Sequence, residues 1–392
     1  MPDHWRTVFL RELFEETNSR KGEVSDAFPV LSVLKTGSIV RSEDYFNRSV
    51  ASRDTSKYKV VEPDWWAYST IHINEGSIAP NRLGFAGVVS PMYTTMRWNS
   101  SSDDSEFWSL RLLSTEMINQ YDSFASGTVN RRKSLKFKKF ADISVAVPPL
   151  DEQRRIVDLV GSIDTYIDSL ETQIETTRTA RSALLSELLS NPGDDWQETT
   201  LGEVGEVNPK EAPLAEDAPF VPMDAVNVGQ RWVEYTEPRG TRSGARARAG
   251  DVLFARITPC LENGKTAQVQ NEIDRCGGST EFIVLRGSER VDADFLYFWA
   301  TDRNVRERAA NLMTGSTGRQ RLSPKDLASM TLSVPPLDEQ RRIVDLVGSL
   351  DEQISLLESQ VESVRALRSG VLSELLSGER LLDESYDLAV GI

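Results

Sequence analysis

The chain has 392 residues, 39% of them hydrophobic, which is enough for two or three domains that each bury a core. No segment approaches the ~20 consecutive apolar residues that cross a membrane, the N-terminus is too acidic and interrupted for a secretory signal, and two cysteines, Cys260 and Cys276, supply neither a disulfide framework nor a zinc site. The net charge of −15 disfavours nucleic-acid binding without excluding it, and a reducing cytoplasm is the simplest location.

Residues 1–147 predict a mixed α/β globule with many short strands. Gly84–Met96 is rich in the β-branched and aromatic residues of strands, and Glu106–Ala125 has apolar residues at helical spacing. The region holds 19 basic and 18 acidic residues, so its net charge is +1 and the acidity of the chain lies elsewhere.

Residues 148–190 predict one long helix, which Pro148-Pro149 precedes and Asn191-Pro192-Gly193 ends. Its apolar positions alternate by four and three residues, which is typical of a coiled-coil seam. At ~1.5 Å per residue, about 38 residues form a rod on the order of 57 Å long. The seam positions are Ile156, Val160, Ile163, Ile167, Leu170, Ile174, Thr177, Arg181, Leu184 and Leu188.

Residues 191–334 predict a second mixed α/β globule. Gly250–Ile257 and Glu281–Leu285 have the composition of strands, and Arg290–Met313 has apolar residues at helical spacing. This region holds 17 basic and 22 acidic residues.

Residues 335–378 predict a second long helix, because the chain repeats itself. Val147–Ser162 and Val334–Ser349 both read VPPLDEQRRIVDLVGS, and LSELLS at Leu185–Ser190 returns at Leu372–Ser377, each with an offset of 187 residues. A fainter echo aligns Trp5 with Trp196 at an offset of 191. The seam positions of this copy are Ile343, Val347, Leu350, Ile354, Leu357, Val361, Val364, Arg368, Val371 and Leu375.

The two helices are expected to pack on each other, since each alone would expose a long apolar stripe. A globule separates them, which favours antiparallel pairing within the chain. Two arginines occupy seam positions, and full overlap predicts that Arg181 contacts Asp351 and Arg368 contacts Asp164, which would fix the register.

A glycine interrupts each helix, at Gly161 and Gly348, where it costs ~1 kcal/mol relative to alanine. Either this cost is tolerated, or the glycines allow a neighbouring backbone to approach closely.

The predicted fold is α+β: two mixed α/β globules (1–147 and 191–334) alternate with two long helices (148–190 and 335–378) that pair as a pseudo-twofold antiparallel coiled coil. An acidic tail, 379–392, follows. Segment 148–190 has 4 basic and 8 acidic residues and segment 335–392 has 5 and 12, so together they carry −11 of the net −15.

Each globule ends in a basic segment. The first contains Arg131, Arg132, Lys133, Lys136 and Lys138, and the second contains Ser316, Thr317, Arg319, Gln320, Arg321 and Lys325. At an offset of 187, Arg132 falls on Arg319, Leu135 on Leu322 and Lys138 on Lys325. A Gly/Ser/Thr-rich loop with guanidinium groups can hold phosphate, and Arg and Gln can address guanine and adenine edges. The alternative is a solvated basic loop before a strand.

A third candidate DNA-contacting segment is Arg239–Gly250, with Arg242, Arg246 and Arg248; the alternative is a flexible surface loop. Motifs for catalysis are scarce. His4 and His72 suggest no dyad, and we find no P-loop, no HExxH, no GxGxxG after a strand and no Asn/Asp-Pro-Pro-aromatic tetrad of amino-methyltransferases. Zinc is not expected either. These patterns favour a binding protein over an enzyme.

The layout resembles the specificity subunits of type I restriction–modification enzymes across essentially the whole chain. The resemblance rests on several segments together: the two PPLDEQRRIV helix starts, LGEV at Leu201–Val204, Gly250–Lys265, Gly278–Arg286 and Gly315–Leu322.

The resemblance implies two target-recognition domains, each reading one half of a bipartite, asymmetric DNA site, with the paired helices setting the gap between the halves. It implies a non-catalytic chain without a cofactor of its own, which docks two methyltransferase subunits that hold S-adenosylmethionine, and restriction–translocase subunits. A specificity partner of a fused restriction–methyltransferase is a close variant.

Two other functions stay open. The acidity would suit a coiled-coil scaffold or adaptor that binds proteins without contacting DNA. A hidden nuclease or methyltransferase is the third possibility, against which the missing motifs argue.

Overall fold

The computed structural model describes residues 2–22, 28–46, 54–126, 133–316, 318–382 and 385–386. The chain divides into two compact units, and each long helix contributes to both. Unit 1 comprises Met1–Asp168 and Glu362–Ile392, and unit 2 comprises Ser169–Val361. These two units do not test the predicted domain bounds, so the division into two globules, two helices and a tail stays a prediction.

Unit 1 is built around a four-stranded antiparallel sheet in the order β2-β9-β6-β7. Its strands are β2 (Phe14–Thr17), β9 (Tyr93–Trp98), β6 (Trp66–Ser69) and β7 (Ile78–Pro80). Three antiparallel strand pairs surround it: β1 (Arg6–Phe9) with β10 (Ser144–Val147), β3 (Leu31–Val33) with β4 (Ile39–Arg41), and β5 (Lys59–Val61) with β8 (Gly87–Val89). The short helices are α1 (Leu10–Leu13), α2 (Ser42–Tyr45), η1 (Ile73–Glu75), α3 (Ser105–Arg111), α4 (Thr115–Phe124) and α5 (Phe137–Ala141).

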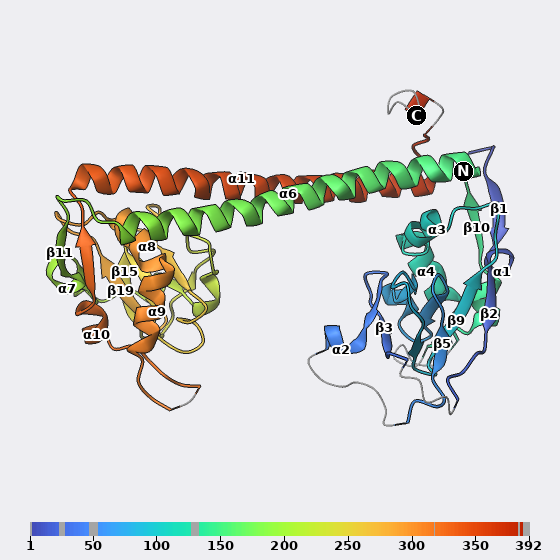
Figure 1. Ribbon diagram of the computed structural model, residues 1–392, viewed down its shortest axis with the longest axis horizontal. Helices are drawn as coiled ribbons and strands as arrows, with labels where there is room; N and C mark the ends of the chain where they lie inside the picture. The colour runs from blue at the N-terminus through green and yellow to red at the C-terminus, as the bar shows by residue number, and fades with distance from the viewer. Residues whose placement is uncertain are drawn as a thin grey trace. The chain divides into compact units, whose positions relative to one another are not determined.

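Unit 2 repeats that sheet as β12-β19-β16-β17. Its strands are β12 (Glu206–Val207), β19 (Phe282–Arg286), β16 (Val252–Ala255) and β17 (Thr266–Gln268). A second sheet contains β14 (Glu237–Pro238), β13 (Pro219–Val221), β18 (Arg275–Gly278) and β15 (Ala245–Arg248), and β11 (Gln197–Thr200) pairs with β20 (Thr331–Val334). The short helices are α7 (Leu201–Val204), η3 (Met223–Ala225), α8 (Ala293–Thr301), α9 (Arg303–Asn311) and α10 (Pro324–Ala328). Helix α8 packs against β16, β17 and β19 (Figure 1).

Two of the helices expected from the sequence are each broken into two. Within Glu106–Ala125 the chain turns between α3 and α4, where the Ser114 side chain accepts a hydrogen bond from the N–H of Met117. Within Arg290–Met313 it turns between α8 and α9, where the Asp302 carboxylate accepts from the N–H groups of Asn304 and Val305. The capping side chain starts a new helix in both places, although the apolar spacing continues across it.

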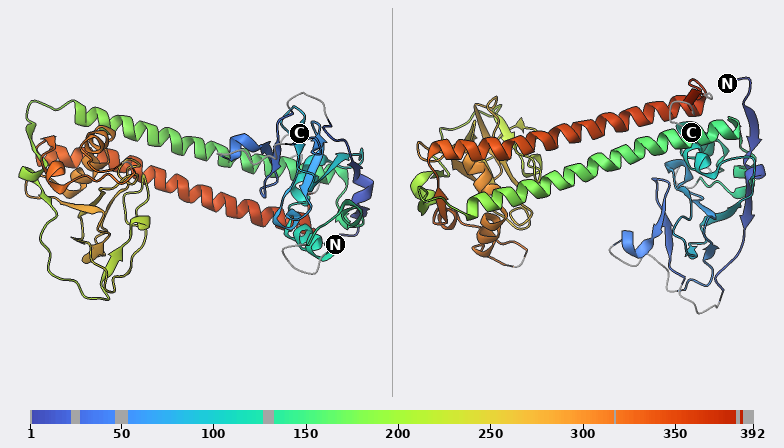
Figure 2. Two further views of the ribbon diagram at one scale, coloured as in Figure 1. Left: turned by 90° about the horizontal axis from the view of Figure 1, so that it is seen from below. Right: turned by 45° about the horizontal axis from the view of Figure 1, so that its top comes forward.

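The long helices are α6 (Leu150–Ser190) and α11 (Leu337–Ser377). They lie side by side in all views of Figures 1 and 2. All twenty seam positions predicted from the sequence are buried or half-buried. In unit 1 the start of α6 and the end of α11 share one hydrophobic core with the globular part, through Ile156, Val160 and Leu375. In unit 2 the end of α6 and the start of α11 do the same, through Leu185, Ile343 and Val347.

Both predicted arginine–aspartate contacts are confirmed. In unit 2 the Nε of Arg181 lies 2.5 Å from Oδ1 of Asp351, and its Nη2 lies 3.1 Å from Oδ2. In unit 1 Arg368 makes the same two-pronged contact with Asp164, with Nη2 2.8 Å from Oδ2. The register of the antiparallel pair is therefore the predicted one.

The two helix glycines have open surroundings. A Cβ built on Gly161 or Gly348 meets nothing within 4 Å among the residues that the structure describes. The glycines therefore do not serve a close backbone approach, and their helical cost is tolerated.

A buried glutamine joins each long helix to its globule in the same way. The side-chain amide of Gln153 donates to the carbonyl of Pro148 (3.0 Å) and accepts from the N–H of Asp104 (2.9 Å). Gln340, its equivalent at the offset of 187, donates to the carbonyl of Pro335 (2.9 Å) and accepts from the N–H of Asp292 (2.7 Å). The sequence repeat is thus a repeat of tertiary contacts.

Candidate nucleic-acid interface

The basic segment at the end of each globule is held by an equivalent hydrogen bond. In unit 1 the N–H of Leu135 donates to the carbonyl of Thr70, directly after β6, at 2.8 Å. In unit 2 the N–H of Leu322 donates to the carbonyl of Arg256, directly after β16, also at 2.8 Å. The alignment of Leu135 with Leu322 at the sequence offset of 187 therefore holds in space.

In unit 2 three segments that are distant in sequence meet at the end of β16. The N–H of Arg256 donates to the carbonyl of Glu281 (2.9 Å), and the N–H of Thr258 donates to the carbonyl of Gln320 (3.1 Å). Ile257 and Arg321 form an antiparallel bridge. These are the Gly250–Lys265, Gly278–Arg286 and Gly315–Leu322 segments, so the sequence features that carry the resemblance gather at one place.

The residues of the second basic segment differ in their partners. Arg321 forms a two-pronged ion pair with Glu281, Nη2 to Oε1 at 2.7 Å and Nε to Oε2 at 3.0 Å, and this contact lowers the pKa of Glu281. The side chains of Arg319 and Gln320 make no hydrogen bond or ion pair with the part of the chain that the structure describes. Ser316, Arg319 and Lys325 are exposed, and Thr317 lies outside the described residues.

The arginines of Arg239–Gly250 lie at the surface around β15. Arg242 contacts residues outside this segment, since its Nη1 lies 2.7 Å from Oε2 of Glu237 and its guanidinium stacks 4.2 Å from the ring centre of Phe220. Arg246 donates to the main-chain carbonyl of Glu211 at 2.8 Å. Arg246 and Arg248 are both exposed on β15. Contacts with other segments therefore hold the side chains of Arg242 and Arg246.

A pocket of about 680 Å³ in unit 2 is lined by part of the third candidate segment and by Arg256, directly after β16. Lys210, Arg246, Arg256, Thr280 and Phe282 are among its lining residues. Arg246 comes from the third candidate segment, whereas the carbonyl of Arg256 holds the second basic segment. Lys210 and Arg256 were not predicted as site residues.

In unit 1 the structure describes three of the five predicted residues. Lys133 forms an ion pair with Asp122 at 3.2 Å, Lys136 precedes α5, and Lys138 is exposed on α5. Arg131 and Arg132 lie outside the described residues.

Unit 1 also has a basic pocket, of about 480 Å³, lined by Lys136 and Lys138 together with Lys59, Thr70 and Tyr93. Lys59 is half-buried, and burial lowers its pKa. Lys59 was not predicted, because it lies on β5 and joins the basic segment only in the folded chain.

The two pockets occupy the same place in the repeated sheet. Ser69 of β6 pairs with Tyr93 of β9, and Ala255 of β16 pairs with Phe282 of β19. Both pockets are lined by this aromatic residue and by the residue that follows the paired β6 or β16 position, Thr70 or Arg256. The site is therefore duplicated, whereas its side chains differ between the units.

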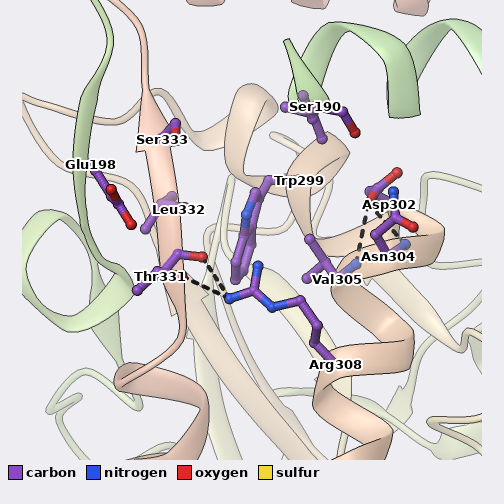
Figure 3. A pocket seen from close by; sticks show the side chains of 11 residues that line it. Ser190, Glu198, Trp299, Asp302, Asn304, Val305, Arg308, Thr331, Leu332 and Ser333 are labelled. Carbon is purple, nitrogen blue, oxygen red and sulfur yellow. Dashed lines mark hydrogen bonds between the residues drawn. The ribbon is translucent and has the colours of Figure 1, made fainter. Parts of the chain in front are cut away.

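A smaller pocket of about 170 Å³ in unit 2 has a structural character (Figure 3). Arg308 donates to the carbonyl and the hydroxyl of Thr331 on β20, at 3.0 and 2.9 Å. Asp302 caps α9 and accepts from the hydroxyl of Ser186 on α6 at 2.6 Å. These polar groups bind one another, and none of the predicted site residues lines this pocket.

The described residues contain no cluster of three or more His, Cys, Asp and Glu side chains that could hold a metal ion. Each histidine contacts one glutamate: His4 lies 3.0 Å from Glu152, and His72 lies 3.1 Å from Glu75. Among the described residues, we find no helix with the length and hydrophobicity that a bilayer crossing requires.

Comparison with known proteins gives one consistent family. Residues 193–365 match the family described as type I restriction modification DNA specificity domain. The chain is 19% identical over 422 residues to the putative type I restriction enzyme MjaX specificity subunit of Methanocaldococcus jannaschii, covering 97% of this chain and 94% of that protein. It is 30% identical over 175 residues to the EcoAI specificity subunit of Escherichia coli, a match that spans 43% of this chain and only 30% of the relative.

Two solved structures share the fold. One comes from a study of complex assembly and conformational transition of the type I R-M system; its TM-score is 0.64 at 19% identity, over 96% of this chain and 98% of the other. The other is the HsdS subunit from Thermoanaerobacter tengcongensis, with a TM-score of 0.53 at 20% identity, over 97% and 98% of the two chains. Mixed sheets and two long paired helices are thus features of the fold that these proteins share.

Proposed function

We propose that the chain, which is similar to type I restriction–modification specificity subunits, recognises a bipartite, asymmetric DNA site. Each unit reads one half of the site. The paired helices set the number of unread base pairs between the halves, since a rigid spacer fixes the distance between two readers.

One observation carries this proposal: the two units place a basic pocket at the same position of the same sheet but line it with different side chains. Unit 1 uses Lys59, Lys136 and Lys138, and unit 2 uses Lys210, Arg246 and Arg256. A shared framework gives both units the same approach to a duplex. Different side chains give the two halves of the site different sequences.

The chain supplies recognition, and its partners supply the chemistry. We infer two methyltransferase subunits that hold S-adenosylmethionine, and restriction–translocase subunits in the complete enzyme. The net charge of −15 limits how firmly the chain alone binds DNA, which is a polyanion. The acidic helical segments are therefore better suited to docking protein partners than to contacting DNA. Much of the phosphate contact is then made by the methyltransferases.

The alternative is a scaffold that binds proteins without contacting DNA. A gel-shift of the full chain with its proposed methyltransferase partner, on duplexes from the host genome, separates the two functions. Recognition predicts a sequence-specific shift that weakens steeply with salt, by ~0.9 in log–log slope for each phosphate contact. A stable protein complex that leaves every duplex unshifted would favour the scaffold.

Arg319 provides a test of which unit reads which half. Its exposed guanidinium has no partner in the described part of the chain, so it is free to contact DNA. Replacing it with alanine should weaken or relax recognition of one half-site only, by about 1–3 kcal/mol of discrimination. Methylation of duplexes substituted in either half is the measurement, and equal loss in both halves would remove Arg319 from the interface.

A further inference from the structure

Arg256 has an unusual electrostatic position in the pocket of unit 2. Its Nε atom is buried and has no hydrogen-bond partner, and its guanidinium forms no ion pair with the described residues. The main chain around it is fixed, since its N–H and carbonyl are bonded to Glu281 and Leu322. A half-buried cation without a partner is costly unless something else supplies the acceptor.

Glu211 lines the pocket and the neighbouring Glu281 does not, and other arginines already bind both carboxylates. Glu281 is bound on both oxygens by Arg321. Glu211 lies 2.7 Å from Arg286 and 3.6 Å from Arg275, and the pKa of its carboxylate is lowered by these contacts, Arg286 first. The charge of Arg256 also helps to lower the pKa of Glu281, but neither carboxylate forms a hydrogen bond or ion pair with Arg256 among the described residues.

Two further cations line the same pocket without a carboxylate partner among the described residues. Lys210 is exposed, and Arg246 spends one donor, Nη1, on the main-chain carbonyl of Glu211. The hydroxyl of Thr280 also lines the pocket. The recess therefore offers three positive charges and a hydroxyl to an anion, and the carboxylate that lines it, Glu211, is paired with Arg286.

We propose that this pocket binds a single backbone phosphate of the DNA, with Arg256 as the central ligand and Arg246 and Lys210 at its rim. The proposal rests on the proposed function and adds a site that positions the duplex. A recess fits a phosphate better than a base edge, because phosphates protrude along the rims of a groove whereas base edges lie ~8.5 Å deep at its floor.

Unit 1 cannot use the equivalent position in this way. Thr70 stands there, and its hydroxyl donates to the carbonyl of Met92 at 2.9 Å. The phosphate site is therefore specific to unit 2, and its loss should loosen only the contact that this unit makes.

The test is a salt titration of DNA binding by the full chain assembled with its methyltransferase subunits, on a duplex that carries the host's modified motif. Arg256→Ala should weaken binding about ten- to a hundred-fold and reduce the log–log salt slope by ~0.9, the value for one phosphate. Arg256→Lys should retain the slope. The ratio of affinities for the motif and for singly substituted duplexes should stay unchanged.

Matched variants keep the result interpretable. Arg303→Ala removes an exposed arginine whose ion pair is with Glu307 on its own helix, and this variant should bind as the wild type. Arg246→Ala and Lys210→Ala remove exposed rim charges and should each lower the salt slope even if Arg256→Ala folds poorly, which circular dichroism would reveal.

Two outcomes would overturn the phosphate site. A salt slope unchanged in all three pocket variants would show that no phosphate lies there, and a relaxed preference at one base pair with Arg256→Ala would show a base contact instead. Failure of the wild-type complex to bind any duplex specifically would contradict the proposed function itself. That result is distinct from the two outcomes that would contradict only the phosphate site.

Discussion

At the scale of single residues, the two cysteines differ sharply in environment. Cys276 is buried, and burial raises the pKa of its thiol to about 12, whereas Cys260 is partly exposed. Because the thiolate is the reactive form, iodoacetamide at pH 8 should label Cys260 in the folded chain and reach Cys276 only after unfolding. Mass spectrometry of the labelled chain checks this, and rapid native labelling of Cys276 would contradict the buried position.

The glutamines that begin the long helices should be among the least replaceable polar residues. Gln153→Ala and Gln340→Ala each leave a buried carbonyl and a partly buried N–H without the glutamine partner, so each should lower the free energy of unfolding by about 1–3 kcal/mol. Urea denaturation measures the change. Gln173, an exposed glutamine of α6, provides the control. A loss of stability no larger than that of Gln173→Ala would contradict the inference that Gln153 and Gln340 join each long helix to its globule.

At this scale the sequence predicted some contacts well and missed others for a physical reason. The Arg181–Asp351 and Arg368–Asp164 pairs follow from helical spacing, which determines which side chains share a face. Arg256 and Lys59 become site residues only through strand pairing between distant segments, and no periodicity in the sequence encodes that pairing. One indication for Arg256 was present in the sequence, because this residue lies in Gly250–Lys265, a segment that carries the family resemblance.

At the scale of elements, the pairing of α6 with α11 depends on two arginine–aspartate ion pairs. Arg181→Ala leaves the carboxylate of Asp351 partly buried without its cation, so it should lower the free energy of unfolding by about 1–3 kcal/mol, and Arg368→Ala should act similarly. Exchanging the charges in Arg181→Asp with Asp351→Arg should recover part of the loss. Thermal unfolding of the single and double variants tests this; additive losses would mean that the pair does not interact.

The helix glycines offer the opposite effect. Since a Cβ at Gly161 or Gly348 meets nothing within 4 Å, Gly161→Ala and Gly348→Ala should each raise the free energy of unfolding by ~1 kcal/mol through helix propensity. The control is Gly244→Ala, where a Cβ would lie 1.9 Å from the carbonyl oxygen of Gly278, and which should destabilise. Destabilisation by the helix variants would indicate a contact at these positions that the chain alone does not make.

The long helices were predictable because repetition and a 4-3 spacing are both written in the sequence. The shorter helices were predicted too long. Apolar spacing continues across Asp302 and Ser114, and only the capping bond decides that a new helix begins there. A local polar cap outweighs periodicity at such points.

At the scale of the whole molecule, the account depends on duplication with divergence. Each unit repeats the same sheet order, the same contacts of a buried glutamine at the start of its long helix, and the same hydrogen bond that holds its basic segment. The two pockets nevertheless carry different basic side chains. The duplicated helices could be predicted from the sequence, because the two copies share identical segments. The duplicated pockets could not be predicted from the sequence, because they depend on strand pairing between distant segments, β6 with β9 and β16 with β19.

The most direct test of this account is single-molecule methylome sequencing of a host that expresses the chain together with the proposed methyltransferase subunit. We expect one modified motif made of two short, unlike specified halves separated by a fixed number of unspecified base pairs. A single undivided motif, two identical halves, or no modification that depends on this chain would contradict it.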